Sequence, residues 1–289
     1  MSAPLADLGG RTCLVTGATS GIGRAAAFAL AELGASLVLV ARDPERGKAT
    51  CEEIRTKTGN ADVGLLRADL SSQREIRGLA EEFLASGRPL HVLLNNAGVV
   101  LQRREETEDG IEATFAVNHL GYFLLTNLLL DRIRESAPAR IVNVASDAHA
   151  YAGGRLDFDD LDSRTGYSFM RVYGKSKLAN ILFTRELARR QEGSGVTANS
   201  LHPGFVGSRF ATNNGALASL VMRLARPIAR SPERGARTAV YLCASPEVEG
   251  VTGKYFYDEK PKWPKSFAQN DEDARRLWEV SERLTGLAA

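Results

Sequence analysis

The chain has 289 residues, of which 44% are hydrophobic and 25% are charged, and its net charge at pH 7 is +2. These are ordinary values for a globular protein with a sizeable core, and so small a charge argues against nucleic acid as a partner. Three widely separated cysteines (Cys13, Cys51 and Cys243) fit reduced thiols better than a disulfide framework, so we expect a cytoplasmic protein. Four histidines without metal-ligand spacing predict no metal site.

The sequence shows no sign of a targeting segment or a membrane anchor. Residues 1–11 have no basic flank followed by an apolar core, which a secretory signal requires. We also expect no uncharged apolar stretch to reach the ~18 residues that a membrane-spanning helix needs.

Short apolar stretches rich in β-branched residues alternate with helical patterns. We expect strands at 12–15, 37–41, 63–66, 91–94, 140–145, 196–201 and 255–257, and helices at 22–33, 45–57, 72–85, 111–135, 172–191 and 271–285. This alternation is typical of a parallel sheet covered on both faces. Because no linker or repeat divides the chain, the prediction is one α/β domain over residues 1–289, a doubly wound parallel sheet of the Rossmann type with helices on both faces.

A glycine-rich stretch lies where the first expected strand passes into the first helix. Residues 16–23 read T-G-A-T-S-G-I-G, with the spacing G-x-x-x-G-x-G. Glycines let the backbone turn tightly and approach a pyrophosphate, and the helix N-terminus adds free N–H groups and partial positive charge. In this strand–turn–helix setting the stretch predicts dinucleotide binding by Gly17, Ser20, Gly21, Ile22 and Gly23.

The end of the second strand indicates which dinucleotide binds. An NAD-binding protein is expected to place an acidic residue there, but Arg42 is the first charge past this strand. A guanidinium suits a 2′-phosphate, so NADP(H) is the preferred cofactor, and Arg24 could assist; the alternative interpretation of Arg42 is a solvated charge at a strand end. Asp43 keeps NAD(H) possible. Asp69 and Leu70, after the third strand, are placed to contact adenine, although Asp69 could instead cap the next helix.

Tyr173 and Lys177 lie four residues apart in a segment with a helical pattern, so both side chains face the same way. A nearby cation favours the ionised form of a phenol and brings its pKa within range for proton transfer, which predicts acid–base chemistry. The same spacing also arises by chance on exposed helices, so the pair needs support from other residues.

These stretches together resemble the short-chain dehydrogenase/reductase family over nearly the whole chain. The matching residues, in the family's order, are T-G-x-x-x-G-I-G at 16–23, N-N-A-G at 95–98, Asn118, Ser146, Y-x-x-x-K at 173–177 and P-G at 203–204. Finer matches at 146–149, 175–180, 182–187 and 277–287 are similar to the retinol dehydrogenase group, as is the long gap between Ser146 and Tyr173. Members of that group often carry an N-terminal membrane anchor, which we do not expect here.

The resemblance implies hydride transfer between a nicotinamide and a carbonyl or alcohol carbon. It makes Tyr173 the acid for reduction and the base for oxidation, and Lys177 the group that lowers the Tyr173 pKa and holds the nicotinamide ribose. Ser146 would orient the carbonyl, and Asn118 would hold a water that links Lys177 to solvent, or mark a local distortion of the helix 111–135, or both. His149 could reach the substrate pocket or be an ordinary loop residue. The remaining expected cofactor contacts are Asn96, Ala97, Gly98, Pro203, Gly204 and Val206.

The segment 204–231 interrupts the strand and helix pattern and is interpreted as a substrate lid. Its large apolar residues are Phe205, Phe210, Leu217, Leu220 and Met222, which could cover a site or simply pack the loop down. An apolar lid favours hydrophobic aldehydes, ketones or alcohols over sugars or charged acids.

The predicted function is therefore an NADP(H)-dependent oxidoreductase that interconverts a hydrophobic carbonyl compound and its alcohol. One alternative is a catalytically idle NADP(H)-binding regulatory protein, which the complete set of Ser146, Tyr173 and Lys177 argues against. Another is an epimerase or dehydratase of nucleotide sugars, although no separate C-terminal substrate domain is expected. Helices 111–135 and 172–191 form dimer faces in many relatives, so a homodimer or homotetramer is also considered.

Overall fold

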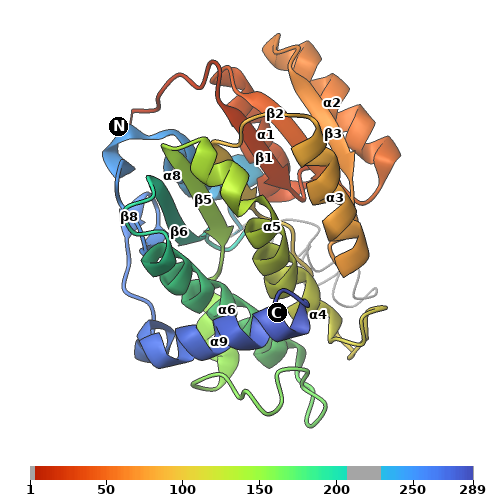
Figure 1. The fold of residues 1–289 in the computed structure, drawn as a ribbon, viewed down its shortest axis with the longest axis vertical. Coiled ribbons are helices and arrows are strands. Elements are labelled where there is room, and N and C mark those ends of the chain that lie inside the picture. The colour runs from red at the N-terminus through yellow and green to blue at the C-terminus, as the bar shows by residue number, and fades with distance from the viewer. Residues whose placement is uncertain (1–3, 207–228, 289) are drawn as a thin grey trace.

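The computed structural model describes residues 4–206 and 229–288, and its strands form one sheet in the order β3-β2-β1-β4-β5-β6-β7-β8 (Figure 1). The strands are β1 Thr12–Thr16, β2 Ser36–Ala41, β3 Val63–Arg67, β4 Val92–Asn95, β5 Ala139–Val144, β6 Val196–His202, β7 Tyr255–Tyr257 and β8 Lys260–Pro261. All neighbours from β3 to β7 pair in parallel. The seven predicted strands are confirmed, and the chain order reverses between β1 and β4, where open α/β sheets bind ligands.

The sheet ends in a short strand that the sequence pattern did not predict. β8 pairs antiparallel with β7 through a tight turn in which Asp258 and Glu259 have φ values of 47° and 63°. Such turns favour Gly or Asn, so an Asp-Glu pair gives little sign of one. The parallel sheet therefore carries one antiparallel edge strand.

Helices cover both faces of the sheet. They are α1 Gly21–Glu32, α2 Pro44–Thr58, α3 Gln73–Ala85, α4 Ala113–Phe115, α5 Gly121–Glu135, α6 Phe169–Arg190, α8 Pro232–Ala244 and α9 Asp271–Leu284. Leu30 of α1 and Ile54 of α2 share a core with Val15 of β1, and α8 joins them on that face. Phe83 of α3 packs with Leu14 of β1 on the other face, together with α5 and α6. Neighbouring residues of β1 thus enter different cores, as the alternation of side chains along a strand requires.

The stretch 111–135, expected as one helix, is divided. α4 is followed by a π-helix, Ala116–Leu120, and then by α5. Contrary to our expectation, the helical span 113–135 is long and apolar enough to cross a membrane, with a mean hydropathy of 1.3, the one such helix among the described residues. Its most apolar part is 83% buried in the protein, as a core helix is. A π-helix widens the backbone locally and often marks a functional site.

The C-terminal helix α9 lies across α6 (Figure 1). Its Trp278 is 4% exposed and contacts Phe123 of α5 and Phe183 of α6, at ring-centroid distances of 4.9 and 5.8 Å. The guanidinium of Arg190 lies 4.2 Å from the Trp278 ring. The chain's own helix therefore occupies a surface of α5 and α6, the two helices considered above as a dimer face.

Truncation of Trp278 tests this packing. Trp278→Ala removes a buried aromatic ring from three contacts, so we expect the free energy of unfolding in urea to fall by about 3–5 kcal/mol. Trp263→Ala is the matched control, because Trp263 is 82% exposed; its free energy of unfolding should stay within about 0.5 kcal/mol of the wild type. Equal losses in the two variants would contradict the docking of α9.

Candidate active site

The glycine turn after β1 is locked to the segment after β4. The Thr16 hydroxyl accepts hydrogen bonds from the backbone N–H groups of Asn96 (2.9 Å) and Ala97 (3.1 Å), and the Asn96 amide donates to the Thr16 carbonyl (2.9 Å). Gly17 has φ of 66°, and a Cβ there would lie 2.8 Å from the Ala97 Cα. A Cβ on Gly23 would lie 2.5 Å from the Gly17 oxygen. Both glycines are therefore required by close approach within the protein.

The N-terminus of α1 follows this turn and fits an anionic group. α1 begins at Gly21, and its first turn holds no acidic residue. Ser20 is the N-cap residue of α1, and its side chain makes no capping hydrogen bond to any described residue. Free N–H groups and partial positive charge at this end suit a pyrophosphate. Arg24 pairs instead with Glu53 of α2 and lies over Phe28, so the expectation that it helps to bind a 2′-phosphate is not supported.

Arg42 and Asp69 meet at the carboxyl ends of β2 and β3. The Arg42 side chain is 70% exposed, and its Nη1 lies 3.6 Å from Asp69 Oδ2. Asp69 Oδ1 accepts hydrogen bonds from the N–H and hydroxyl of Ser71. Asp69 does not cap α3, because Ser72 holds the cap position and accepts from the Glu75 N–H. A largely exposed guanidinium is thus left at the rim of the expected cofactor crevice.

The neighbouring acidic residue is already engaged. Asp43 caps α2, where its carboxylate accepts from the N–H groups of Glu45 (3.0 Å) and Arg46 (3.2 Å). Leu70 is 7% exposed, and its carbonyl lies 3.2 Å from where a Cβ of Gly121 would be. Leu70 therefore packs on the start of α5.

Tyr173, Lys177 and Ser146 come together where β5 ends and α6 passes over it. Ser146 caps a 3-10 helix, Asp147–Ala152, by accepting from the Ala148 N–H (3.1 Å), and its side chain also hydrogen-bonds Tyr173. The Lys177 Nζ donates to the Val144 carbonyl at 2.9 Å and lies 5.6 Å from the centroid of the Tyr173 ring. The structure thus brings Ser146 together with Tyr173 and Lys177, which follow it by 27 and 31 positions in the sequence.

Burial dominates the ionisation of this pair. It raises the pKa of Tyr173 above the ordinary value for a phenol, and the hydrogen bond from Ser146 offsets this only in part. It lowers the pKa of Lys177 to about 7, since the ammonium is out of contact with water. The net shift of the Tyr173 pKa is therefore upward, opposite in direction to the lowering expected from Lys177, because burial outweighs the other effects.

Asn118 lies in the π-helix and joins two parts of the site. Its Oδ1 accepts from the Val99 N–H (2.7 Å), and its Nδ2 donates to the Val99 carbonyl (3.0 Å) and the Ser176 hydroxyl (3.0 Å). Ser176 in turn donates to the Tyr173 carbonyl (2.8 Å). The local helix distortion considered for Asn118 is present, and its side chain ties Val99, which directly follows the 95–98 segment, to the helix of Tyr173.

Two residues have structural roles that the sequence reasoning missed. A Cβ on Gly174 would lie 2.7 Å from the Ala148 carbonyl and 2.8 Å from the Ala152 nitrogen, so only glycine lets the 3-10 helix lie on α6. His149 Nδ1 lies 2.8 Å from the Ser146 carbonyl, and its Nε2 accepts from the Lys265 N–H (3.1 Å). His149 thus holds the backbone of Ser146. A glycine inside a helix lowers the stability of the helix by about 1 kcal/mol relative to alanine. A glycine inside the predicted helix, such as Gly174, was therefore the available sign of a close contact.

The P-G turn after β6 leads back toward the glycine turn. Gly204 has φ of 84°, and Val206 forms an isolated bridge with Arg230. A Cβ on Gly235 would lie 2.5 Å from Val206 and 3.3 Å from Ile22. Most of the expected lid lies outside the described residues, including Phe210, Leu217, Leu220 and Met222.

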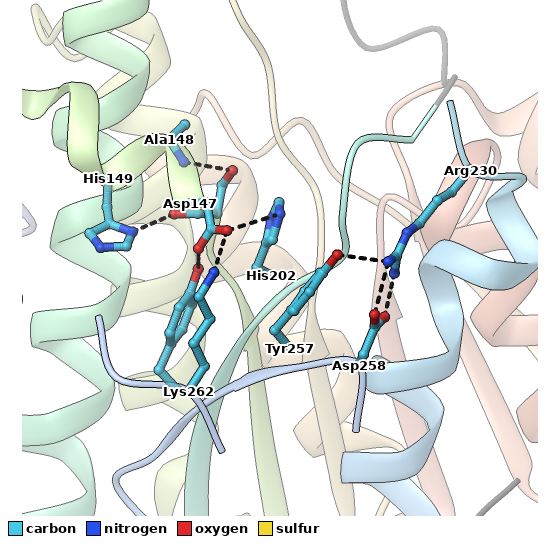
Figure 2. A network of polar contacts seen from close by, with 10 residues as sticks. Asp147, Ala148, His149, His202, Arg230, Tyr257, Asp258 and Lys262 are labelled. Atoms are coloured by element: carbon cyan, nitrogen blue, oxygen red, sulfur yellow. Dashed lines mark hydrogen bonds and ion pairs between the residues drawn. The ribbon is translucent and has the colours of Figure 1, made fainter. Parts of the chain in front are cut away.

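A polar network continues from Ser146 along the carboxyl edge of β6 and β7 (Figure 2). Asp147 pairs with Lys262 and accepts from Tyr255, and its Oδ2 lies 3.5 Å from His202 Nε2. The His202 ring stacks on Tyr257 at 5.2 Å. Figure 2 shows the Tyr257 hydroxyl pointing toward Arg230, which pairs with Asp258.

Comparison with known proteins identifies the class of enzyme. The family model described as short chain dehydrogenase matches residues 11–157. The chain belongs to the short-chain dehydrogenase family, and it is an oxidoreductase that uses NAD(P) to interconvert alcohols and carbonyl compounds.

Similar relatives extend over nearly the whole chain. Retinol dehydrogenase 12 of Mus musculus is 46% identical over 278 residues, which are 96% of this chain and 87% of that protein. Retinol dehydrogenase 14 of Homo sapiens is 44% identical, again covering 96% and 87%. A solved Mycobacterium paratuberculosis protein has 31% identity and a TM-score of 0.78, covering 98% of this chain and 96% of its own. The Pseudomonas aeruginosa RhlG/NADP active-site complex has 29% identity and a TM-score of 0.69, covering 91% and 98%. The resemblance to the retinol dehydrogenase group is thus confirmed.

The close contact at Gly174 gives a test of the site's geometry. Gly174→Ala should push the 3-10 helix away from α6, lower the free energy of unfolding by about 1–3 kcal/mol and reduce NAD(P)-linked turnover, because Ser146 and Tyr173 separate. Gly78→Ala in α3 is the control, since no described atom lies within 4 Å of its Cβ position. That variant should gain up to about 1 kcal/mol of helix propensity and keep its activity. Normal turnover in Gly174→Ala would contradict the assigned packing.

Proposed function

We propose that the protein is an NADP(H)-dependent oxidoreductase that interconverts a hydrophobic carbonyl compound and its alcohol, with Tyr173 as general acid and base. The observation that carries this proposal is the buried cluster in which Ser146 hydrogen-bonds Tyr173 beside Lys177. Such a set of matched groups at the carboxyl ends of parallel strands is the place and chemistry that proton transfer to a carbonyl oxygen needs.

When it is bound, the nicotinamide supplies the hydride for reduction or accepts it in oxidation. The Ser146 hydroxyl orients the carbonyl oxygen of the substrate, and Tyr173 gives that oxygen its phenolic proton. The raised pKa of Tyr173 keeps this proton in place until it is needed. Lys177, whose pKa is lowered to about 7, takes up and releases protons near neutral pH, and as ammonium it stabilises the tyrosinate. In oxidation Tyr173 acts as the base instead.

Two observations support NADP(H) as the preferred cofactor. Arg42 offers a 70% exposed guanidinium where β2 ends. The carboxylate of Asp43, the residue that would favour NAD(H), is occupied in capping α2. Gly17, Gly21, Gly23, Asn96, Ala97, Gly98, Pro203, Gly204 and Val206 would surround the cofactor, with Ser20 and Ile22 at the phosphates and Asp69 and Leu70 near the adenine.

Exposed apolar side chains support a hydrophobic substrate. Tyr151 is 62% exposed in the 3-10 helix after Ser146, Phe169 and Met170 are 41% and 39% exposed in the first turn of α6, and Phe205 is 52% exposed after the P-G turn. The 3-10 helix is capped by Ser146 and α6 carries Tyr173, so an apolar molecule at the site would find apolar surface beside it. The names of the relatives, retinol dehydrogenases, agree with an apolar alcohol.

We further propose a cytoplasmic location, because the three cysteines are free and buried. We also propose that the face of α5 and α6 beneath α9 forms no dimer, since a partner subunit would have to displace Trp278 from its pocket.

Replacement of the phenolic hydroxyl tests the role of Tyr173. Tyr173→Phe keeps the ring in place but removes the proton, so we expect carbonyl reduction to fall by about 10²–10⁴-fold. Binding of NADPH, followed by its fluorescence, should be unchanged. Turnover is measured with aldehydes and ketones of graded chain length. Near-normal turnover in this variant would rule out the role, and a wild type that binds NADPH but reduces no member of the series would favour the regulatory alternative.

Replacement of the rim guanidinium tests the cofactor preference. Arg42→Ala should raise the Kd for NADPH by about 10–100-fold, because a charged hydrogen bond to the 2′-phosphate contributes about 1.5–3 kcal/mol. The Kd for NADH should barely change. Arg134→Ala, in the last turn of α5, removes the same charge where Arg134 contacts Asp131 and Gln191, and it should affect neither Kd. Equal losses for the two cofactors in Arg42→Ala would contradict the assignment.

A further inference from the structure

A histidine in the π-helix lies beside the candidate active site but has no role in the proposed reaction. His119 directly follows Asn118, is completely buried and is surrounded by Phe115, Phe123 and Phe183 at ring-centroid distances of 5.1, 6.3 and 6.0 Å. Burial lowers the pKa of His119 to about 3, so the ring is neutral near neutral pH. A neutral imidazole has one hydrogen-bond donor and one acceptor, and each must find a partner in a site without water.

The partners of His119 come from two different helices. Its Nε2 lies 2.9 Å from the hydroxyl of Ser281 in α9. The side chain of Asn180 in α6 lies near the ring and raises the pKa of His119, against the larger effect of burial. Among the described residues, His119 Nδ1 and Asn180 Oδ1 are both buried and neither has a hydrogen-bond partner, so these two atoms of neighbouring side chains are the ones left to pair with each other. We therefore assign the proton to Nδ1, which donates to Asn180, while Nε2 accepts from Ser281.

Asn180 continues the path to the catalytic lysine. With its oxygen turned to His119, its Nδ2 donates to the Val144 carbonyl at 3.3 Å. The same carbonyl accepts from the Lys177 Nζ at 2.9 Å. Val144 is the last residue of β5, two positions before Ser146. One buried path thus runs from Ser281 through His119, Asn180 and the Val144 carbonyl to Lys177.

We propose that Ser281, His119 and Asn180 form a hydrogen-bonded relay through which α9 positions the Lys177 ammonium. The proposal rests on the role of Lys177 in the proposed function. A lysine side chain has a flexible four-carbon stem, so its head group is held in place only by its acceptors. Each member of the relay fixes the next: the Ser281 donor sets the tautomer of His119, and this tautomer sets the orientation of the Asn180 amide. An amide turned the other way would place its oxygen against the Val144 carbonyl and leave two donors facing each other at His119.

Other contacts keep α9 in place, so an effect on the position of Lys177 can be distinguished from a loss of folding. The Trp278 ring is buried against α5 and α6, Arg155 pairs with Asp273 at 2.6 Å, and Arg185 pairs with Asp271 at 2.6 Å. Loss of the Ser281 hydroxyl therefore leaves the helix docked and removes only the first donor of the relay.

The test compares two buried hydroxyls of the C-terminal region. Ser281→Ala removes the donor to His119. Thr285→Val is the matched control, because Thr285 is 1% exposed and, within residues 4–206 and 229–288, its hydroxyl donates only to backbone carbonyls of α9. With NADPH and the best carbonyl substrate, Ser281→Ala should lower kcat about tenfold and shift the pH profile of kcat, with the KM for NADPH unchanged. Thr285→Val should leave both at wild-type values. Equal effects in the two variants, or none in Ser281→Ala, would overturn the relay.

A double-mutant cycle tests whether the members act as one path. Asn180→Ala removes the middle of the relay, so adding Ser281→Ala to it should cause no further fall in kcat. If the two falls in kcat multiply, the residues act independently and the relay is wrong.

The ¹⁵N signals of the His119 ring nitrogens give a readout that does not depend on activity. The sequence has four histidines, so His119→Gln identifies the signal by its loss. In ¹⁵N spectra of the NADPH complex, His119 should show the Nδ1–H tautomer, unchanged from about pH 5 to 9. Ser281→Ala should shift the Nε2 signal and Asn180→Ala the Nδ1 signal. An Nε2–H tautomer in the wild type would refute the relay even if Tyr173 is the proton donor, and failure of the Tyr173 prediction would leave this result standing.

Discussion

Burial of the Lys177 ammonium is the constraint on which the arrangement of the active site depends. The residue is 2% exposed, and its head group lies near the rings of Tyr122 and Tyr173, at 5.8 and 5.6 Å from their centroids. A buried cation without acceptors is strongly disfavoured, so the surrounding chain must supply them at fixed places. The carbonyl of Val144 does so because β5 ends directly under the helix that carries the lysine. The position of α6 on the sheet is thereby set by a polar requirement as well as by apolar packing.

The polar groups beneath this cluster form a continuous ladder through the core. Asn95 of β4 donates to Thr126 of α5 (3.0 Å) and to Asn143 of β5 (2.9 Å), Asn143 donates to Thr184 of α6 (3.0 Å), and Thr184 donates to the Asn180 carbonyl (2.6 Å). Fully buried polar groups rigidify a core when they are paired in this way. Two strands and two helices are therefore held in one register directly below the residues proposed to transfer the proton. Small displacements of α6 against the sheet would break several of these bonds together.

The sequence pattern predicted the sheet, because strands and helices depend on local features. Apolar stretches gave seven strands, and strand-end residues such as Ser146 lie where parallel strands place them. The features that the sequence pattern did not predict depend on contacts between distant parts of the chain. His119 and Ser281 are 162 positions apart, so no local pattern could pair them. The π-helix was predicted only in part: Asn118 indicated a local distortion of the helix, but neither its type nor its bounds could be predicted from the sequence.

The ionisation of Tyr173 differs from what the spacing of Tyr173 and Lys177 alone would indicate. A four-residue spacing brings a cation near a phenol, and that effect alone lowers the phenol's pKa. The same folding step removes water from both groups, and the structure gives the larger weight to this second effect, which disfavours each charge. The two groups thus favour the neutral pair in the protein alone, and a tyrosinate is tolerated only while Lys177 carries its proton. Proton release by Tyr173 and protonation of Lys177 are therefore coupled, so whatever fixes the distance between them, including the groups that hold the Lys177 head, acts directly on the proposed chemistry.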